Sequence, residues 1–385
     1  MQATLEKLCS SVDSFMEKRP DTRLKAVKAA ILCLRSAYIG LDETWGYSST
    51  CLSGIEFILK RGRTEERASA AECLAVLCTQ VDSIELQDWL EKIRYHLEVI
   101  YRDAGEPYVV RGSCALALST LLFFTFDGNY DFLKETMNNL ELIFRGSCPK
   151  GDGKVPFLSS ETVLLHLNTL QAWTLIYTML PKHDANIIGK SSLITLIGLI
   201  KCSNVDVRIS AGESVAIIYE RIRAETDVKY QGTHFRNLCQ LLNDLSTDGA
   251  KSRSKEDRKK QRHSFREIVN SIVRDEAPDT TVRFGNQETL QIDTWCSHFY
   301  YNLLCDLLGG GLPNHLRDNI ILRQIFDLGS PLPRIGLRTN IRGSRKASRA
   351  QRNYANQFAF KMRTQILSSK RDKRSNIIVD EDGAL

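Results

Sequence analysis

The chain has 385 residues, a hydrophobic fraction of 43 % and a charged fraction of 25 %, which are ordinary values for a protein of two or three globular units. No apolar run reaches the roughly 18 residues that a membrane span needs. The N-terminus alternates apolar and charged residues where a secretory signal would be continuously apolar, so we expect an intracellular protein with no membrane partner.

The net charge of +6 conceals a strong asymmetry. Between Arg334 and Arg374 the sequence has thirteen Lys or Arg and one acid, Asp372, which gives a local charge of +12. The rest of the chain therefore carries −6. A mildly acidic body with one concentrated basic arm points to a polyanionic partner for the arm.

Residues 1–247 show a succession of helical patterns that repeat along the chain, with no strand alternation. Five similar stretches can be aligned on a small residue, and the aligned positions are Ala29, Ala71, Ala115, Thr169 and Gly212. Their spacings are 42, 44, 54 and 43 residues, and armadillo and HEAT repeats have about 40–47. A Gly-, Pro- and Lys-rich loop at 147–157 accounts for the long spacing. We predict an all-α solenoid of the armadillo or HEAT kind.

A mostly helical C-terminal region is expected over residues 248–333, after a polar linker. Ser254 and Asp257 form a capping box that predicts a helix from about Lys255 to Arg274. One face of this helix is apolar and consists of Phe265, Ile268, Val269 and Ile272. Beside it runs a basic stripe of Lys255, Arg258, Lys259, Arg262 and Arg266. The stripe suits phosphate contacts, and a solvated helix face is the alternative.

The remainder of this region contains the one stretch with strand-like alternation, at about 280–292. A helix is predicted from Thr294 to Leu308, and we expect three glycines and Pro313 to end it. Another short helix and a turn should follow before the basic arm.

The basic arm covers residues 334–378 and precedes a short acidic tail at 379–385. Projected at 100° per residue, Arg345, Arg349 and Arg352 share one stripe, while Tyr354 and Phe358 fall on the opposite side. This segregation predicts a helix that lies against a negatively charged partner. A nuclear-localisation signal is the alternative for the arm's charge.

Other chemistry finds little support in the sequence. Gly189-Lys-Ser-Ser resembles the end of a phosphate-binding loop, but Asp184 occupies the place of the required first glycine. The eleven cysteines include no C-x-x-C, and Cys33, Cys73, Cys114 and Cys239 lie in apolar helical stretches. We therefore expect buried structural thiols, core or boundary roles for His166 and His298, no metal, no cofactor and no enzymatic activity.

Four motifs occur in order along residues 251–378. They are KSRSKEDRKKQRHSFREI, TVRFGNQETLQIDTW, LGGGLPNHLRDNIILRQIFDLGSPL and NQFAFKMRTQILSSKRDKRS. Together they resemble the C-terminal region of the interferon-related developmental regulator family, and the preceding helical repeats resemble that family's armadillo-like N-terminal region.

The resemblance implies a non-enzymatic regulator of gene expression, cytoplasmic and also nuclear. Members of the family bind translationally idle ribosomes, across the tRNA sites, with a C-terminal helix in the mRNA channel of the small subunit. The implied rRNA-contacting cations here are Arg345, Lys346, Arg349, Arg352, Lys361, Arg363, Arg371, Lys373 and Arg374. Tyr354 and Phe358 would pack or stack beside them. The alternative is nuclear co-regulation of transcription with histone-deacetylase complexes.

Overall fold

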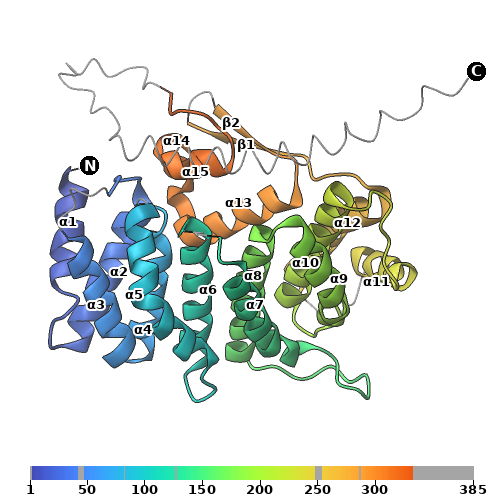
Figure 1. The fold of residues 1–385 in the computed structure, drawn as a ribbon, viewed down its shortest axis with the longest axis horizontal. Helices are drawn as coiled ribbons and strands as arrows, with labels where there is room; N and C mark the ends of the chain where they lie inside the picture. Colours follow the sequence, from blue (N-terminus) through green and yellow to red (C-terminus); the bar gives the residue numbers. More distant parts are fainter. Residues whose placement is uncertain are drawn as a thin grey trace, which may run out of the picture.

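The computed structural model describes residues 2–41, 47–81, 83–125, 128–247, 254–285 and 288–332. Within these ranges the protein is all-α apart from one small hairpin (Figure 1). The first helices are α1 (Gln2–Asp13), α2 (Pro20–Ser36), α3 (Ser48–Arg61), α4 (Thr64–Leu77), α5 (Ser83–Arg102) and α6 (Tyr108–Thr125). They continue as α7 (Tyr130–Phe144), the 3-10 turn η1 (Arg145–Ser147), α8 (Ser160–Met179), α9 (Lys182–Leu199), α10 (Val205–Glu225) and α11 (Phe235–Thr247).

Alternate helices form a row that runs the length of the body. In this row α2 packs on α4, α4 on α6, α6 on α8, and α8 on α10 (Figure 1). The five aligned small residues fall one in each of these helices, so the predicted register of the repeat is confirmed. Three of them, Ala71, Ala115 and Thr169, are no more than 1 % exposed, whereas Ala29 is half-buried. The solenoid is thus present, and its assignment to the armadillo or HEAT kind stays a prediction.

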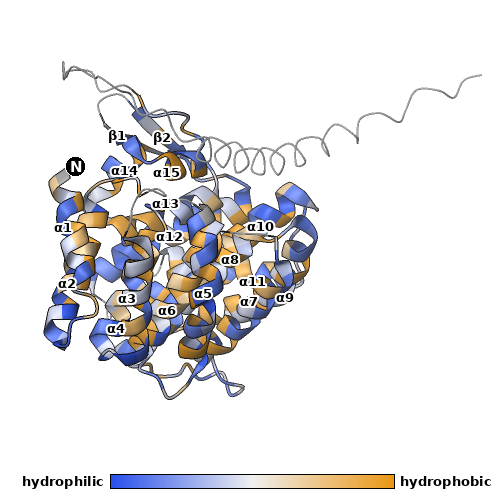
Figure 2. Cartoon of the chain, turned by 60° about the vertical axis from the view of Figure 1, so that its left-hand side comes forward, coloured by the Kyte–Doolittle hydropathy of each residue, from blue (hydrophilic) through white to orange (hydrophobic). Residues whose placement is uncertain are grey.

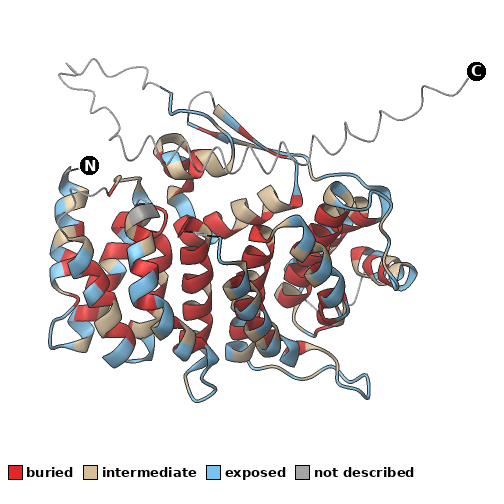
Figure 3. Ribbon diagram, in the orientation of Figure 1, coloured by how far each residue is buried: buried red, intermediate tan, exposed pale blue. Residues whose placement is uncertain are grey.

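The central helix of the row is α6. It is the one helix of the described part of the chain that is long and apolar enough to cross a membrane, judged by length and composition alone. Most of it is buried among α4, α5 and α8, as its colour in Figure 3 shows. Hydrophobic residues continue along the neighbouring helices (Figure 2), so the composition of α6 is that of a core helix.

The loop predicted between two repeats is present between η1 and α8. Its start packs on α9, where a Cβ on Gly198 would lie 3.3 Å from the sulfur of Cys148. Its end is open to solvent, with Phe157 97 % exposed. The insertion therefore lengthens one connection without disturbing the row.

The C-terminal region begins with α12 (Lys255–Arg274), whose predicted bounds and N-cap residue are confirmed, while of the predicted capping box the described structure shows one of the two bonds. The Ser254 side chain accepts a hydrogen bond from the Asp257 amide at 3.0 Å. The four predicted apolar residues are buried. Phe265 and Ile268 pack on α10 at Gly212, where an added Cβ would lie 2.8 Å from Ile268 Cδ1. A glycine at this aligned position thus lets two helices approach closely.

A two-stranded antiparallel hairpin follows, made of β1 (Thr280–Phe284) and β2 (Glu288–Ile292). Thr280 pairs with Ile292, and Phe284 with Glu288. This is the predicted strand-like stretch. Phe284, Leu290 and Ile292 are buried, so the hairpin shares the core with the helices that follow it.

The chain then returns along the body as a crossing segment of α13 (Trp295–Leu308), η2 (Gly309–Gly311), α14 (Leu312–Asp318) and α15 (Ile320–Ile325). Helix α13 contacts α10, α4 and α2, and so lies across the row (Figure 1). On the way its Tyr300 ring lies 5.1 Å from the Phe123 ring of α6, measured between centroids.

Both ends of α13 are held by charged side chains of the row. At the N-terminus the Glu220 carboxylate of α10 accepts hydrogen bonds from the amides of Trp295 and Cys296, at 2.6 and 3.3 Å. At the C-terminus Arg35 of α2 donates to the Leu307 carbonyl at 2.6 Å. An anion at the start of a helix and a cation at its end both complement the helix dipole.

Two expectations for the crossing segment are corrected. Pro313 does not terminate a helix but sits in the first turn of α14, where its missing N–H costs nothing. The expected single short helix is two helices, α14 and α15, because Asn319 takes an extended conformation and caps the second one.

Candidate nucleic-acid interface

The basic stripe on α12 is the predicted site that the structure places most fully. Its five residues, Lys255, Arg258, Lys259, Arg262 and Arg266, are exposed or half-exposed. Within the described ranges no carboxylate lies within ion-pair distance of any of them. Unneutralised cations that recur along one helix face form a ready site for phosphate groups.

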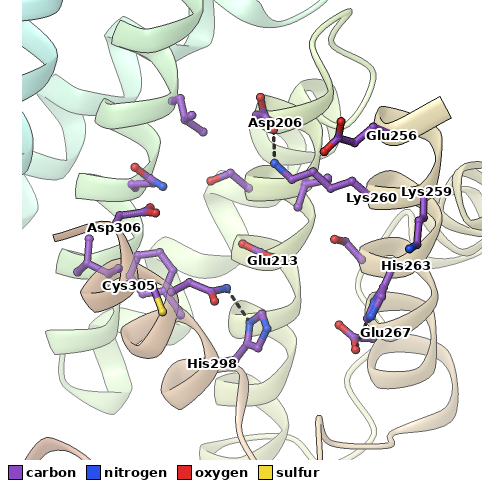
Figure 4. Close-up of a pocket in the computed structure, with 18 residues that line it drawn as sticks. Asp206, Glu213, Glu256, Lys259, Lys260, His263, Glu267, His298, Cys305 and Asp306 are labelled. Carbon is purple, nitrogen blue, oxygen red and sulfur yellow. Dashed lines mark hydrogen bonds and ion pairs between the residues drawn. The ribbon is translucent and has the colours of Figure 1, made fainter. Parts of the chain in front are cut away.

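The adjacent side of α12 has a different character. Lys260 there is neutralised by Asp206 of α10, with 2.5 Å between nitrogen and oxygen. Glu256, His263 and Glu267 lie on the same side and, with Lys259, line a cavity (Figure 4). In the described structure α12 thus presents the unpaired stripe and, next to it, a mixed, largely acidic wall, and Lys259 of the stripe lies at the boundary between them.

This cavity has a volume of about 740 Å³ and lies between α8, α10, α12 and α13. Its lining includes the buried apolar side chains Ile209, Phe299 and Leu303. Five carboxylates also line it: Asp206, Glu213, Glu256, Glu267 and Asp306. Against them stand two lysines, Lys259 and Lys260, so the cavity is acidic.

Glu213 occupies the centre of the cavity wall (Figure 4). It is partly buried, and no hydrogen bond or ion pair reaches it from the rest of the described structure. Burial raises its pKa to about 7; Lys260 opposes the rise, while Glu267 and Asp306 add to it. No sequence pattern points to this group, because its cavity neighbours lie on helices far apart in the chain.

The histidines of interest have structural surroundings. His166 is buried, and its Nδ1 lies 2.5 Å from the Ser147 hydroxyl. Burial, with a contribution from Arg111, lowers its pKa to about 4. His298 also has a lowered pKa because it is largely withdrawn from solvent. In the described ranges no three His, Cys, Asp or Glu side chains are grouped as a metal site requires.

The thiols and the apparent phosphate-loop fragment also lie in structural surroundings. All eleven cysteines are free, and burial raises the pKa of Cys73 and of Cys114 to about 12. Cys239 is half-buried, which is more exposed than the sequence indicated. Gly189–Ser192 lies inside α9, so its backbone amides are not gathered around an anion as in a phosphate-binding loop.

The predicted rRNA-contacting residues of the arm lie outside the described residues. They are Arg345, Lys346, Arg349, Arg352, Tyr354, Phe358, Lys361, Arg363, Arg371, Lys373 and Arg374. Their roles stay predictions. The described part of the candidate interface is therefore the stripe on α12.

Fold and stripe together define a class: a helical-repeat protein with a helix beside its last repeats whose basic stripe has no carboxylate partner among the described residues. Residues 1–273 match the family model described as interferon-related developmental regulator, and residues 319–375 match the interferon-related protein conserved region. The chain belongs to the interferon-related developmental regulator family.

Named relatives agree with the family models over nearly the whole chain. Interferon-related developmental regulator 1 from Homo sapiens is 32 % identical over 373 residues, which is 96 % of this chain and 81 % of the relative. Interferon-related developmental regulator 2 from Mus musculus is 33 % identical over 375 residues, with 97 % and 83 % covered. The similarity to these relatives thus covers both the helical row and the C-terminal region of this chain.

Proposed function

We propose that this protein is a non-enzymatic regulator of differentiation that binds ribosomes through rRNA and thereby represses translation or marks idle ribosomes. The observation that carries the proposal is the set of five cations on α12 with no carboxylate partner in the described structure. Such a stripe gains free energy by replacing phosphate counterions, and rRNA supplies phosphates at high density.

The sequence of the arm adds to this argument. Its thirteen cations and one acid lie within 41 residues that follow the described body closely. A helix and an arm that are both basic can hold one polyanion at two places, which raises the effective concentration at the second contact. The resemblance to family members that bind ribosomes supports rRNA as the polyanion.

Co-sedimentation with ribosomes in sucrose gradients, at several salt concentrations, tests the proposal. We expect wild-type protein in the ribosomal fractions at low salt and its release when RNase is added. The triple variant Arg345→Glu, Arg349→Glu, Arg352→Glu should lose binding, because the reversed charges repel phosphates. Each lost phosphate contact should also lower the slope of affinity against salt concentration by about one. The pair Arg262→Glu, Arg266→Glu should weaken it as well.

A matched control changes the same charge elsewhere. Lys25, Lys92 and Lys229 are exposed on the helical body and make no ion pair in the described structure. Their triple replacement by Glu should leave co-sedimentation near wild type. Wild-type protein that stays in the light fractions at low salt would refute ribosome binding, and recovery with histone-deacetylase complexes from nuclei would instead support the transcriptional alternative.

A further inference from the structure

The acidic cavity between α10, α12 and α13 is left unexplained by the proposed function. Its floor is apolar, through Phe299 and Leu303, while Glu213 stands in the wall without a partner in the described structure. Asp306 and Glu256 are exposed at its edge and likewise make no ion pair there. An apolar floor below unpaired carboxylates is unusual for a surface that has only to meet water.

The chemistry of the lining selects one kind of occupant. Lys and Arg side chains combine an aliphatic stem with a charged tip, so the stem can lie on Phe299 while the tip reaches a carboxylate. A charge-assisted hydrogen bond of this kind is stronger when water is partly excluded. A volume of about 740 Å³ accommodates several side chains of a peptide. Metal ions are a poor alternative, because the described carboxylates are not grouped as ligands.

We propose that the cavity binds this chain's own basic arm, residues 334–378, and so holds it in an inactive position when no polyanion is present. The arm is the most basic segment of the chain, with a charge of +12 between Arg334 and Arg374, and it is covalently attached. The described chain ends at Leu332, and a dozen extended residues span about 40 Å. The first cations of the segment 344–361 can therefore lie up to about 40 Å from Leu332.

Attachment makes this contact favourable even when each ion pair is weak. A tethered segment experiences an effective concentration in the millimolar range, so modest affinity suffices for occupancy. Glu213 is suited to the role, because a docked cation would favour its ionised form and the empty cavity does not. RNA would compete for the same cations, and only this competition rests on the proposed function.

Zero-length coupling of carboxylates to amines in the full-length protein tests the docking directly. Carbodiimide joins only groups in contact, and the arm contains Lys346, Lys361, Lys370 and Lys373. We expect mass spectrometry to find arm lysines joined to Glu213 or Asp306 in the monomer fraction. The Glu213→Gln variant should lose the first link. The ion pair between Lys260 and Asp206 gives a link within the body that verifies the folded cavity in every sample.

Two results would overturn the docking. One is the absence of arm links while the Lys260–Asp206 link forms. The other is arm links confined to covalent dimers, which would show that the cavity captures the arm of a second copy.

RNA affinity provides the second readout. The double variant Glu213→Gln, Asp306→Asn should bind a short single-stranded RNA about fivefold more tightly, because the competing contact is gone. Glu91→Gln with Glu276→Gln removes two exposed carboxylates outside the cavity and should change affinity much less. An equal gain for both pairs would refute competition. Failure of wild-type protein to bind RNA would refute the proposed function, while the coupling experiment would still decide the docking.

Discussion

The helical row and the crossing segment share one apolar core, but the crossing segment meets the end of α2 in a different way. Helices of the row meet through apolar side chains, as in α6, where Leu118 and Leu121 are no more than 1 % exposed. The crossing segment instead meets α2 through polar side chains and backbone carbonyls. His315 donates from Nε2 to the Leu34 carbonyl at 3.1 Å, and Asn314 donates to the Ser36 carbonyl at 3.0 Å.

The difference follows from where the contacts occur on a helix. The side of a helix offers side chains, but its last turn offers carbonyls with no partner in the helix. α2 ends at Ser36, so the crossing segment caps it, while Arg35 of α2 caps α13 in return. Both regions therefore gain stability from buried apolar area, and the contact of the crossing segment with α2 adds satisfied polar groups.

Ala115→Asp attacks the row and should have the largest effect. The residue is 1 % exposed at the middle of α6, so the new carboxylate would be buried without a partner. We expect a loss of about 3–5 kcal/mol in the free energy of unfolding, measured by urea denaturation. An unchanged denaturation midpoint would contradict the burial of α6.

Acidification should weaken the row through His166. Its pKa of about 4 lies below the ordinary value of 6.5, so the unfolded state takes up the proton first. Stability is therefore complete above pH 6.5 and falls by about 3 kcal/mol as the pH approaches 4. The difference in unfolding free energy between wild type and His166→Gln should shift by this amount between pH 7 and pH 4. A pH-independent difference would exclude the effect.

Gly311→Ala attacks the crossing segment. Its backbone is not strained, with φ at −84°, but a Cβ would lie 1.7 Å from the Arg35 carbonyl oxygen. We expect a cost of about 1–3 kcal/mol and faster hydrogen exchange at α13 and α14, with the row less affected. Gly310→Ala is the matched control, because no atom lies within 4 Å of its added Cβ. Equal effects of the two variants would argue against the close approach.

Ser254→Ala should have the smallest effect. It tests α12, which belongs to neither the row nor the crossing segment. The change removes the cap at the Asp257 amide and should cost about 1 kcal/mol, again by urea denaturation. Ser254→Asp keeps an acceptor and should restore most of the stability. A Ser254→Ala protein as stable as wild type would show that the cap contributes nothing.

Local patterns in the sequence predicted the elements well. The spacing of Ala71, Ala115 and Gly212 identified alternate helices, because close helix crossings repeat wherever a repeat does. Ser254 and the alternation at 280–292 likewise depend on neighbours in sequence. Within the described residues, the stripe on α12 was predictable for the same reason.

The contacts between distant segments could not be predicted in this way. Gly311 was interpreted as part of a helix stop, and only the fold places it on the Arg35 carbonyl. Glu213 and Asp306 come from helices far apart in the chain, and neither belongs to a motif. The cavity therefore exists only as a product of how α13 crosses α10.

The crossing of α13 also has a consequence for biosynthesis. Repeat helices can pack on their neighbours as they leave the ribosome, since each needs only the next. The end of α2 completes its contacts only later, because Arg35 bonds to the carbonyl of Leu307, which is synthesised 272 residues later. Closure of this long loop comes last, and it ties the first repeat to the last helices. A repeat array in which only neighbours interact can unfold from one end. Because this contact joins the first repeat to the last helices, we expect the protein to unfold cooperatively.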